Sequence, residues 1–385
     1  MESSSPRNSA LYCLLFAFCL LVYMVLFLRA EAQMEIFGYL VLALALAVVG
    51  MLTKLGNFVG DVLRAKESLW EASLFVMAVL LIAIFYEDDY NLFLIGTIMC
   101  YAVAVLGLNV QLGFTGVINF SSASFFGIGC YTAAMLVEHT PIPPLLVMIL
   151  GGVFAALIGC ALLLPVLRTS GNYAALVTMA FALLFNVFLD ICEFFGGSQG
   201  ASVGSMSLFG VEFTESVEWF GLDGSFYIRY DIMALILLTL AFLLVKRIER
   251  SWIGLSLDVV REDEVAASCF GMNIARWKIT AFTIGNFVAG LAGGLYAMML
   301  GYISPANYTF ADSLLFLSIL LLGGIGNRWG VLLATGFVVV VPEKFQMIQE
   351  YRFLIYSALV LLMIVFRPTG LLPRGLRRFV PGGAA

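Results

Sequence analysis

Long runs of apolar residues dominate this sequence and restrict the chain to one class of fold. Twelve such runs, bounded by charged residues, proline or glycine, lie near residues 10–29, 36–53, 72–86, 91–112, 117–137, 144–167, 173–194, 231–247, 277–300, 310–325, 329–342 and 352–366. A helix needs about 20 mostly apolar residues to cross a bilayer, where its backbone must satisfy its own hydrogen bonds. With 62% hydrophobic and 12% charged residues, the chain of 385 residues has more apolar surface than one water-soluble core can bury. We therefore predict an all-α, polytopic integral membrane bundle of about 10–12 transmembrane or half-membrane helices.

Two of the predicted helices are too short to cross the membrane alone. The runs at 310–325 and 329–342 are separated by a glycine-rich segment from Gly323 to Gly330. Because a full span needs about 20 residues, we expect these two runs to be half-helices of one interrupted element.

The distribution of lysine and arginine predicts the orientation of the chain. Positive residues gather at 54–66, 246–278 and 367–378, whereas the acidic connection at 195–230 carries only Arg229. Cytoplasmic connections of membrane proteins are enriched in lysine and arginine. We expect both termini, the 54–70 loop and the 246–278 loop in the cytoplasm, which requires an even number of crossings.

Composition and motifs exclude several classes of function. The net charge of -5 provides no basic face for nucleic acid. The single histidine, His139, lies in a proline-rich connection, and the sequence contains no GxSxG and no P-loop motif. The seven cysteines lack metal-ligand spacing, and we interpret them as small buried hydrophobic residues. We expect no catalytic site, no metal site and no ATP site in this chain.

The charged connection at 246–278 contains a predicted amphipathic helix. Within residues 256–273, three- and four-residue spacing places four side chains on one helical face, namely Leu257, Val260, Glu264 and Ala267. Gly271 is suited to end this helix. We expect a short cytoplasmic helix lying along the membrane surface.

The order of acids, alanines and glycine in this connection resembles the EAA-type loop by which permease subunits of ABC importers dock onto their ATPases. Further segments resemble the LivM-type branched-chain amino acid permeases: Gly107–Gly116, Asn119–Gly129, Tyr131–Ala134, Gly171–Thr178, Gly196–Gly200, Arg261–Ala267, Ala289–Ala297, Gly301–Pro305, Leu322–Gly326 and Phe366–Leu372. These segments cover roughly residues 90–372 in the order found in that family.

The resemblance implies an architecture and a set of partners. It implies a permease core at 71–372, two additional N-terminal helices and a cytoplasmic loop within 1–70, and a basic cytoplasmic tail at 373–385. Such a subunit forms half of the translocation pathway for branched-chain or related hydrophobic amino acids in the bacterial cytoplasmic membrane. The implied partners are a homologous second permease, two ATPases that bind ATP and magnesium, an external binding protein and lipid, and no cofactor is implied for this chain.

The resemblance also implies which residues couple to the ATPases. They are Arg261, Glu262, Asp263, Glu264, Ala266, Ala267 and Gly271. Acidic residues fix the register of a contact through charge pairing, and small residues permit close approach.

Polar residues inside apolar runs are costly and usually face protein or water. The chain has them at Asn109, Gln111, Asn119, Ser121, Ser122, Ser124, Asn172, Thr178, Asn186, Asp190, Asn286, Asp312 and Ser313. We predict that five of them line the translocation path: Asn109, Ser121, Ser122, Asn172 and Thr178. For Asp190 and Asp312, which lie near span ends, a place in the path and a place at the outer interface both stay open.

Four glycines lie among serines and alanines in the same part of the chain: Gly113, Gly116, Gly127 and Gly129. They permit either a break in the helix or close packing of helices. A break would expose backbone amides at the start of a half-helix, where a substrate carboxylate can bind.

The chain departs from the family pattern at Asn119–Ser122, at Phe181–Leu184 and at Phe195, so the identity of the cargo is open. Urea, short amides and aromatic acids are alternatives within the family. An ion-coupled secondary transporter is the main alternative outside it, and an integral membrane enzyme is disfavoured because no histidines, cysteines or paired acids cluster within the runs.

Overall fold

A computed structural model describes residues 6–30, 32–39, 41–42, 67–166, 173–208, 211–213, 217–219 and 222–344, together with isolated positions between 351 and 374. The chain divides into two compact units. The first contains Met1–Ile95, Ser216–Asp231 and Val340–Glu350, and the second contains Gly96–Glu215, Ile232–Val339 and Tyr351–Ala385.

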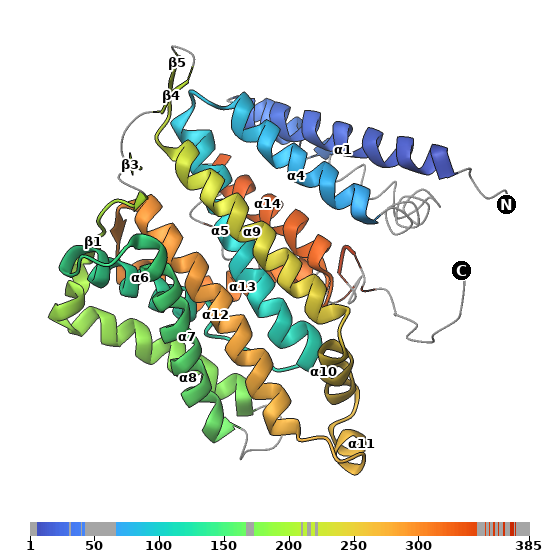
Figure 1. The fold of residues 1–385 in the computed structure, drawn as a ribbon, viewed down its shortest axis with the longest axis vertical. Helices are drawn as coiled ribbons and strands as arrows, with labels where there is room; N and C mark the ends of the chain where they lie inside the picture. The colour runs from blue at the N-terminus through green and yellow to red at the C-terminus, as the bar shows by residue number, and fades with distance from the viewer. Residues whose placement is uncertain are drawn as a thin grey trace. The chain divides into compact units, whose positions relative to one another are not determined.

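In the first unit, α1 (Pro6–Arg29) and α4 (Glu67–Ile84) lie side by side (Figure 1). The rings of Phe16 and Trp70 join the two helices, with centroids 5.6 Å apart. Leu14, Leu15 and Phe18 of α1 are each more than half exposed. An apolar face of this kind is expected of a helix that borders lipid.

A short hairpin belongs to the same unit. Strand β4 (Val217–Trp219) pairs antiparallel with β5 (Leu222–Gly224). Gly224 lies against the ring of Tyr86, and a Cβ there would overlap that ring. The helix predicted at 36–53 falls mostly outside the described residues.

Three helices form the centre of the second unit: α6 (Ser122–His139), α7 (Pro144–Val166) and α12 (Ile274–Leu300), which lie side by side (Figure 1). They approach closely because Gly129, Gly151 and Gly290 meet at one point. A Cβ on Gly129 would overlap the backbone of Gly290, and a Cβ on Gly151 would lie 3.2 Å from the carbonyl oxygen of Gly129. Small residues therefore set the spacing of these helices, as is common in membranes.

The described residues form further helices besides these. They are α5 (Asp89–Leu108), α8 (Tyr173–Ile191), α9 (Tyr227–Glu249), α10 (Trp252–Glu262), α11 (Glu264–Cys269), α13 (Phe310–Gly323) and α14 (Arg328–Lys344), and η1, η2, η3 and η4 are single turns at Asn109–Gly113, Glu193–Phe195, Gly197–Gln199 and Pro305–Asn307. Of the short strands, β1 (Ala201–Ser202) pairs with β6 (Tyr302–Ile303), and β2 (Ser207–Leu208) pairs with β3 (Val211–Glu212), both antiparallel.

The expectation of two half-helices of one interrupted element at 310–342 is wrong: Pro305–Gly323 is long and apolar enough to cross a membrane by itself, and it forms a helical hairpin with α14. Helix α13 ends at Gly323, α14 begins at Arg328, and the backbones of Gly323 and Gly330 are in direct contact. Such contact requires the chain to reverse, since residues seven apart in one continuous helix lie about 10 Å apart. Gly324 and Gly326, with φ of 110° and 84°, form the turn, where only glycine adopts such angles without strain.

The prediction of a polytopic helical membrane protein is confirmed. In the part of the chain that the structure describes, seven helices are long and apolar enough to cross a membrane. The longest, α12, has 27 residues and is about 40 Å long, which exceeds the hydrocarbon thickness of about 30 Å.

Candidate functional site: a broken helix and a cytoplasmic segment

The path of α5 is broken inside the second unit. Its last turn continues into η1, a π-helical turn at Asn109–Gly113, and Gly116 then adopts φ of 72°. Residues 117–121 are not helical, and α6 begins at Ser122. A π-helical turn inside a membrane helix is a frequent mark of a functional site, because it redirects side chains and frees backbone groups.

Three amide side chains form a buried polar cluster at this break: Gln111, Asn119 and Asn286. The Gln111 Nε2 donates to the Asn286 Oδ1 at 2.8 Å, and the Asn119 Nδ2 donates to the Gln111 Oε1 at 2.8 Å. All three side chains are at most 1% exposed. They have room because a Cβ at Gly159 or Gly285 would overlap the amides of Asn286 and Gln111. These bonds offset part of the cost of burying the amides, although the Asn286 Nδ2 has no partner in the described part of the chain.

Three side-chain hydrogen bonds tie the two sides of the break to α8 and to the α13–α14 hairpin. The Thr178 Oγ1 of α8 accepts from the Phe120 N–H at 3.1 Å, and the Ser313 Oγ of α13 accepts from the Ala123 N–H at 3.1 Å. The Asn109 Oδ1 accepts from the Gly326 N–H in the turn between α13 and α14 at 2.8 Å. The break therefore lies at the junction of α6, α8 and the α13–α14 hairpin.

Four of the five residues predicted to line the path lie at this break. Asn109 is in η1, Ser121 and Ser122 begin α6, Thr178 contacts Phe120, and all four are at most 4% exposed. The fifth, Asn172, lies outside the described residues. Within the described part, the Asn109 Nδ2 and the hydroxyls of Ser122 and Ser124 are buried without a hydrogen-bond partner. These atoms have unused hydrogen-bonding capacity.

Backbone amides at the start of α6 are less free than the sequence led us to expect. The Ser121 N–H and hydroxyl both donate to the Asn119 Oδ1, at 2.9 and 2.7 Å, and the amides of Phe120 and Ala123 already have side-chain partners. Unused hydrogen-bonding capacity therefore lies in the hydroxyls of Ser122 and Ser124 and not in these amides.

The sequence left two roles open for the four glycines at 113, 116, 127 and 129, a helix break and close helix packing, and the structure assigns some of them to each role. Gly116 has the positive φ that marks a break. Gly127 and Gly129 lie inside α6, where a Cβ would meet the Tyr308 ring or the Gly290 backbone, so they serve packing. Gly113 faces Asn109 and Gly326, which couples the π-helical turn to the hairpin.

The polar cluster is the feature that sequence reasoning did not assemble. Gln111, Asn119 and Asn286 are visible as polar residues in apolar runs, but Asn286 lies 175 residues from Gln111. Only the fold brings them together.

The two aspartates near span ends have different surroundings. Asp312 forms a capping box with Thr309 at the start of α13, where its Oδ2 accepts from the Thr309 hydroxyl at 2.6 Å. Asp190 is exposed in the last turn of α8. Asp312 therefore has a structural role that explains its presence, and neither residue contacts the polar cluster.

The structure also shows which of the histidine and cysteine side chains are buried and which are exposed. His139 is exposed at the end of α6, as expected of a residue next to a connection. All seven cysteines are free, and Cys13, Cys100 and Cys130 are buried as predicted. The prediction is wrong for Cys19 and Cys269, which are exposed, because α1 presents its apolar side outward and Cys269 ends α11, outside the apolar helices.

Aromatic residues at which the chain departs from the family pattern lie against α6. The Phe181 ring stacks on Phe125, with centroids 5.4 Å apart, and the Phe195 ring packs edge-on against Tyr131 at 5.9 Å. Tyr131 is 2% exposed, and its hydroxyl has no partner within the described part. An aromatic wall thus adjoins the polar break.

The predicted single helix at 256–273 is two helices, which corrects its boundaries. Helix α10 begins at Trp252 with Ser251 as its cap, and α11 begins at Glu264 with Asp263 as its cap. The Asp263 Oδ1 accepts from the amides of Val265 and Ala266 at 2.9 and 3.0 Å, which ends one helix and starts the next. Gly271 has φ of 77° and follows α11, in the role expected of it.

The break at Asp263 changes which residues share a face. Of the four residues predicted to share one face, Leu257, Val260 and Ala267 are fully buried, whereas Glu264 is exposed and pairs with Lys278 at 2.7 Å. Because Ala267 is buried against its own chain, it is not exposed for the ATPase contact expected of it. Two large apolar side chains of α11 and its following turn point outward, since Val265 is 73% and Phe270 85% exposed. Exposed apolar residues beside acids, outside a predicted span, are typical of a protein contact.

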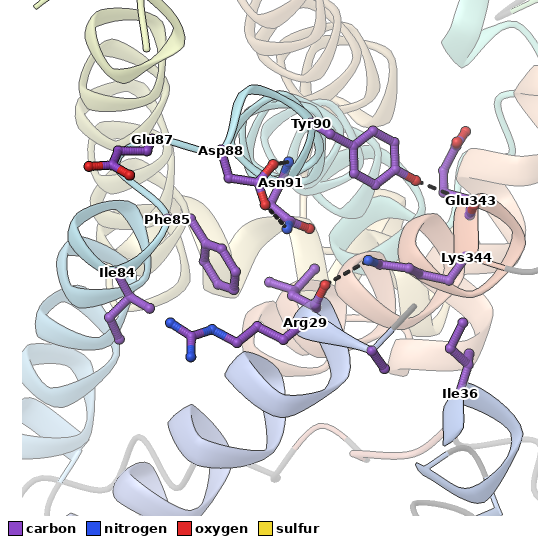
Figure 2. Close-up of a pocket in the computed structure, with 12 residues that line it drawn as sticks. Arg29, Ile36, Ile84, Phe85, Glu87, Asp88, Tyr90, Asn91, Glu343 and Lys344 are labelled. Carbon is purple, nitrogen blue, oxygen red and sulfur yellow. Dashed lines mark hydrogen bonds between the residues drawn. The ribbon is translucent and has the colours of Figure 1, made fainter. Parts of the chain in front are cut away.

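A cavity of about 580 Å³ lies in the first unit and is lined by both charged and apolar residues (Figure 2). The Lys344 Nζ donates to the Leu28 carbonyl at 2.6 Å and lies 5.4 Å from the centre of the Tyr90 ring. The Asn91 amide and the Tyr90 hydroxyl donate to Asp88 and to the Glu343 carbonyl. These groups engage one another across the cavity, which joins the end of α14 to the end of α1.

A bundle of membrane-crossing helices with a buried polar break, joined to an amphipathic segment outside the spans, defines a membrane transport protein of the permease class. The sequence pattern of the family described as branched-chain amino acid transport system / permease component matches residues 90–366. The chain belongs to this family.

Individual relatives agree with this assignment. The chain is 35% identical to the high-affinity branched-chain amino acid transport system permease protein LivM of Salmonella typhimurium, over 78% of this chain and 75% of that protein. It is 34% identical to LivM of Escherichia coli K12 over the same shares. It is 26% identical to LivH of Salmonella typhimurium, over 75% of this chain and 96% of that protein. No solved structure matches significantly.

Proposed function

We propose that this chain is one permease subunit of an ABC importer for branched-chain amino acids in a bacterial cytoplasmic membrane. It pairs with a homologous, LivH-like permease, with two ATPases that supply ATP and magnesium chemistry, and with an external binding protein. The chain itself performs no hydrolysis. The relatives named LivM and LivH support a heteromeric permease pair, and their names support the cargo.

The main support for the proposed ATPase contact is the exposed surface of α11 and the turn after it. Buried Leu257, Val260 and Ala267 anchor the cytoplasmic segment to its own chain, while Val265 and Phe270 remain uncovered. Glu262 and Ala266 are exposed beside them. A partner that covers the apolar residues and pairs with the acid gains both burial and orientation.

The translocation path is proposed at the break between η1 and α6. Asn109 and Ser122 each bury a polar atom with no partner in the described part of the chain. A zwitterionic solute needs such atoms briefly and needs no fixed charge there. Phe125 and Phe181 offer the adjoining apolar surface for an aliphatic side chain.

The test is substrate-dependent uptake by the assembled complex. The tagged full chain is purified with the ATPases and second permease of its source and reconstituted in vesicles with the binding protein outside. We expect radiolabelled leucine to accumulate, and unlabelled isoleucine and valine to compete more strongly than phenylalanine or urea. Competition led by phenylalanine or urea would contradict the cargo, and purification without any P-loop ATPase would contradict the importer.

A further inference from the structure

A charged pair joins the cytoplasmic segment to the C-terminal part of the chain. The guanidinium of Arg374 donates to both carboxylate oxygens of Asp258 in α10, at 2.6 and 2.8 Å. The two side chains are 18% and 29% exposed. A two-bond pair in partly buried surroundings fixes distance and orientation together, which a single-bond pair does not.

The same arginine lies on the broken helix. Its guanidinium carbon is 4.6 Å from the centre of the Phe114 ring, which directly follows η1 and is fully buried. A Cβ at Gly326 would meet the Arg374 Cδ at 2.6 Å, so the stem of the arginine also touches the turn between α13 and α14. Arg374 therefore contacts α10, the π-helical turn and the hairpin at once.

A second residue of α10 reaches the same place. Arg261 lies one turn after Asp258, and its Nη1 donates to the Gly113 carbonyl at 2.5 Å. A Cβ at Gly116 would lie 3.5 Å from the Arg261 Cγ. Helix α10 is thus attached to residues 113–116 both directly and through Arg374.

From this junction, hydrogen bonds continue to the polar cluster. The Gly326 N–H donates to the Asn109 Oδ1 at 2.8 Å, and Gln111 in the same π-helical turn bonds Asn286 and Asn119. The exposed surface at Val265 and Phe270 follows α10 directly in the chain. A displacement that a partner imposes on α10 and α11 therefore reaches the break through these contacts, in addition to reaching α12 through the pair of Glu264 and Lys278.

We propose that Asp258, Arg374 and Phe114 form a clamp that makes the break between η1 and α6 follow the movement of α10, so that Arg374 is a positioning residue for transport. The inference rests on the proposed function, because the movement is the one that ATPases impose.

The test compares variants in the reconstituted complex. In Arg374→Met, the stem length is kept while both hydrogen bonds and the charge are lost. In Asp258→Asn, the charge of the pair is lost. For each, we expect the ATPases to stay bound and to hydrolyse ATP, while leucine uptake per ATP falls roughly tenfold. Arg374→Lys recovers part of the uptake, and the double variant is no worse than either single one. Arg276→Met, which removes an exposed arginine at the start of α12, is the matched control and leaves uptake unchanged.

Hydrogen exchange gives a second measurement, which would not depend on the pair if the pair only stabilised the fold. Adding a non-hydrolysable ATP analogue to the wild-type complex changes the exchange of amides at 110–121, and in Asp258→Asn it does not. Full uptake per ATP in Arg374→Met, or an unaltered response at 110–121 in Asp258→Asn, would overturn the clamp. If Arg374→Met does not fold, Asp258→Asn and Arg374→Lys decide. Failure of the wild-type complex to take up leucine with ATP would instead count against the proposed function.

Discussion

Ser122 is one of the residues at the break whose chemistry separates a transport role from a structural one. Its hydroxyl is buried and has no partner in the described part of the chain, whereas Ser121 and Thr178 hold the backbone of the break. Removing an unpaired buried hydroxyl does not lower stability, because no hydrogen bond is lost. An effect of Ser122→Ala on uptake would therefore report contact with the solute.

We expect Ser122→Ala to keep the melting temperature of the purified chain and to raise the KM for leucine uptake about fivefold, the effect of one hydrogen bond. Ser318→Ala is the matched control, since the Ser318 hydroxyl donates to the Leu314 carbonyl of its own helix. A KM equal to that of the wild type would remove Ser122 from the path.

Alanine substitution at two separate glycines, Gly38 and Gly129, tests the close packing of the central helices. Alanine favours helix over glycine by about 1 kcal/mol. At Gly38, nothing lies within 4 Å of an added Cβ, so Gly38→Ala should be neutral or stabilising. At Gly129, the Cβ overlaps the Gly290 backbone, so Gly129→Ala should destabilise by about 1–3 kcal/mol. Thermal unfolding in detergent measures both, and equal shifts would contradict the close approach of α6 and α12.

At the scale of elements, α11 and its turn form the surface that the proposed ATPase covers. Val265→Asp and Phe270→Ser change residues that are 73% and 85% exposed, so the chain should fold as before. We expect the ATPases to be lost on purification, because apolar residues at the centre of an interface carry much of its affinity. Phe194→Ser, at a residue 70% exposed in η2, is the control. Retention of the ATPases by both α11-region variants would place the contact elsewhere.

Two substitutions that the sequence suggests for the same purpose are poorer probes. Ala267 is fully buried, so Ala267→Arg would disrupt the packing of α11 on its own chain. Gly271 has open space around a Cβ but φ of 77°, so Gly271→Trp would strain the backbone as well as obstruct a partner. Val265 and Phe270 avoid both effects.

The cavity of the first unit connects helix ends through Lys344. Lys344→Met removes the hydrogen bond to the Leu28 carbonyl and the contact with the Tyr90 ring. We expect the free energy of unfolding to fall by about 1–3 kcal/mol. Arg29→Met, at an exposed residue lining the same cavity, should change it little. Thermal unfolding measures both variants. A similar loss of stability in the two would show that the positive charge stabilises the chain and that the contacts of Lys344 do not.

At the scale of the whole molecule, the sequence predicted the class of fold because each membrane-crossing helix is a continuous apolar run of residues. It also predicted an interruption at Gly323–Gly330, since glycines are a local signal, but it did not predict that the chain reverses there. It did not predict the division of the cytoplasmic helix at Asp263, because one side chain capping the next turn interrupts a periodicity that otherwise continues. Nor did it predict the polar cluster, whose members Gln111 and Asn286 meet only in the fold.

The source of energy for transport tests the whole account most directly. Leucine uptake is compared in vesicles that contain this chain alone and in vesicles that contain it with the second permease and the ATPases, each with ATP inside or with an imposed ion gradient. The account predicts uptake only in the complete assembly and only with hydrolysable ATP. Accumulation by this chain alone, driven by a proton or sodium gradient, would contradict it.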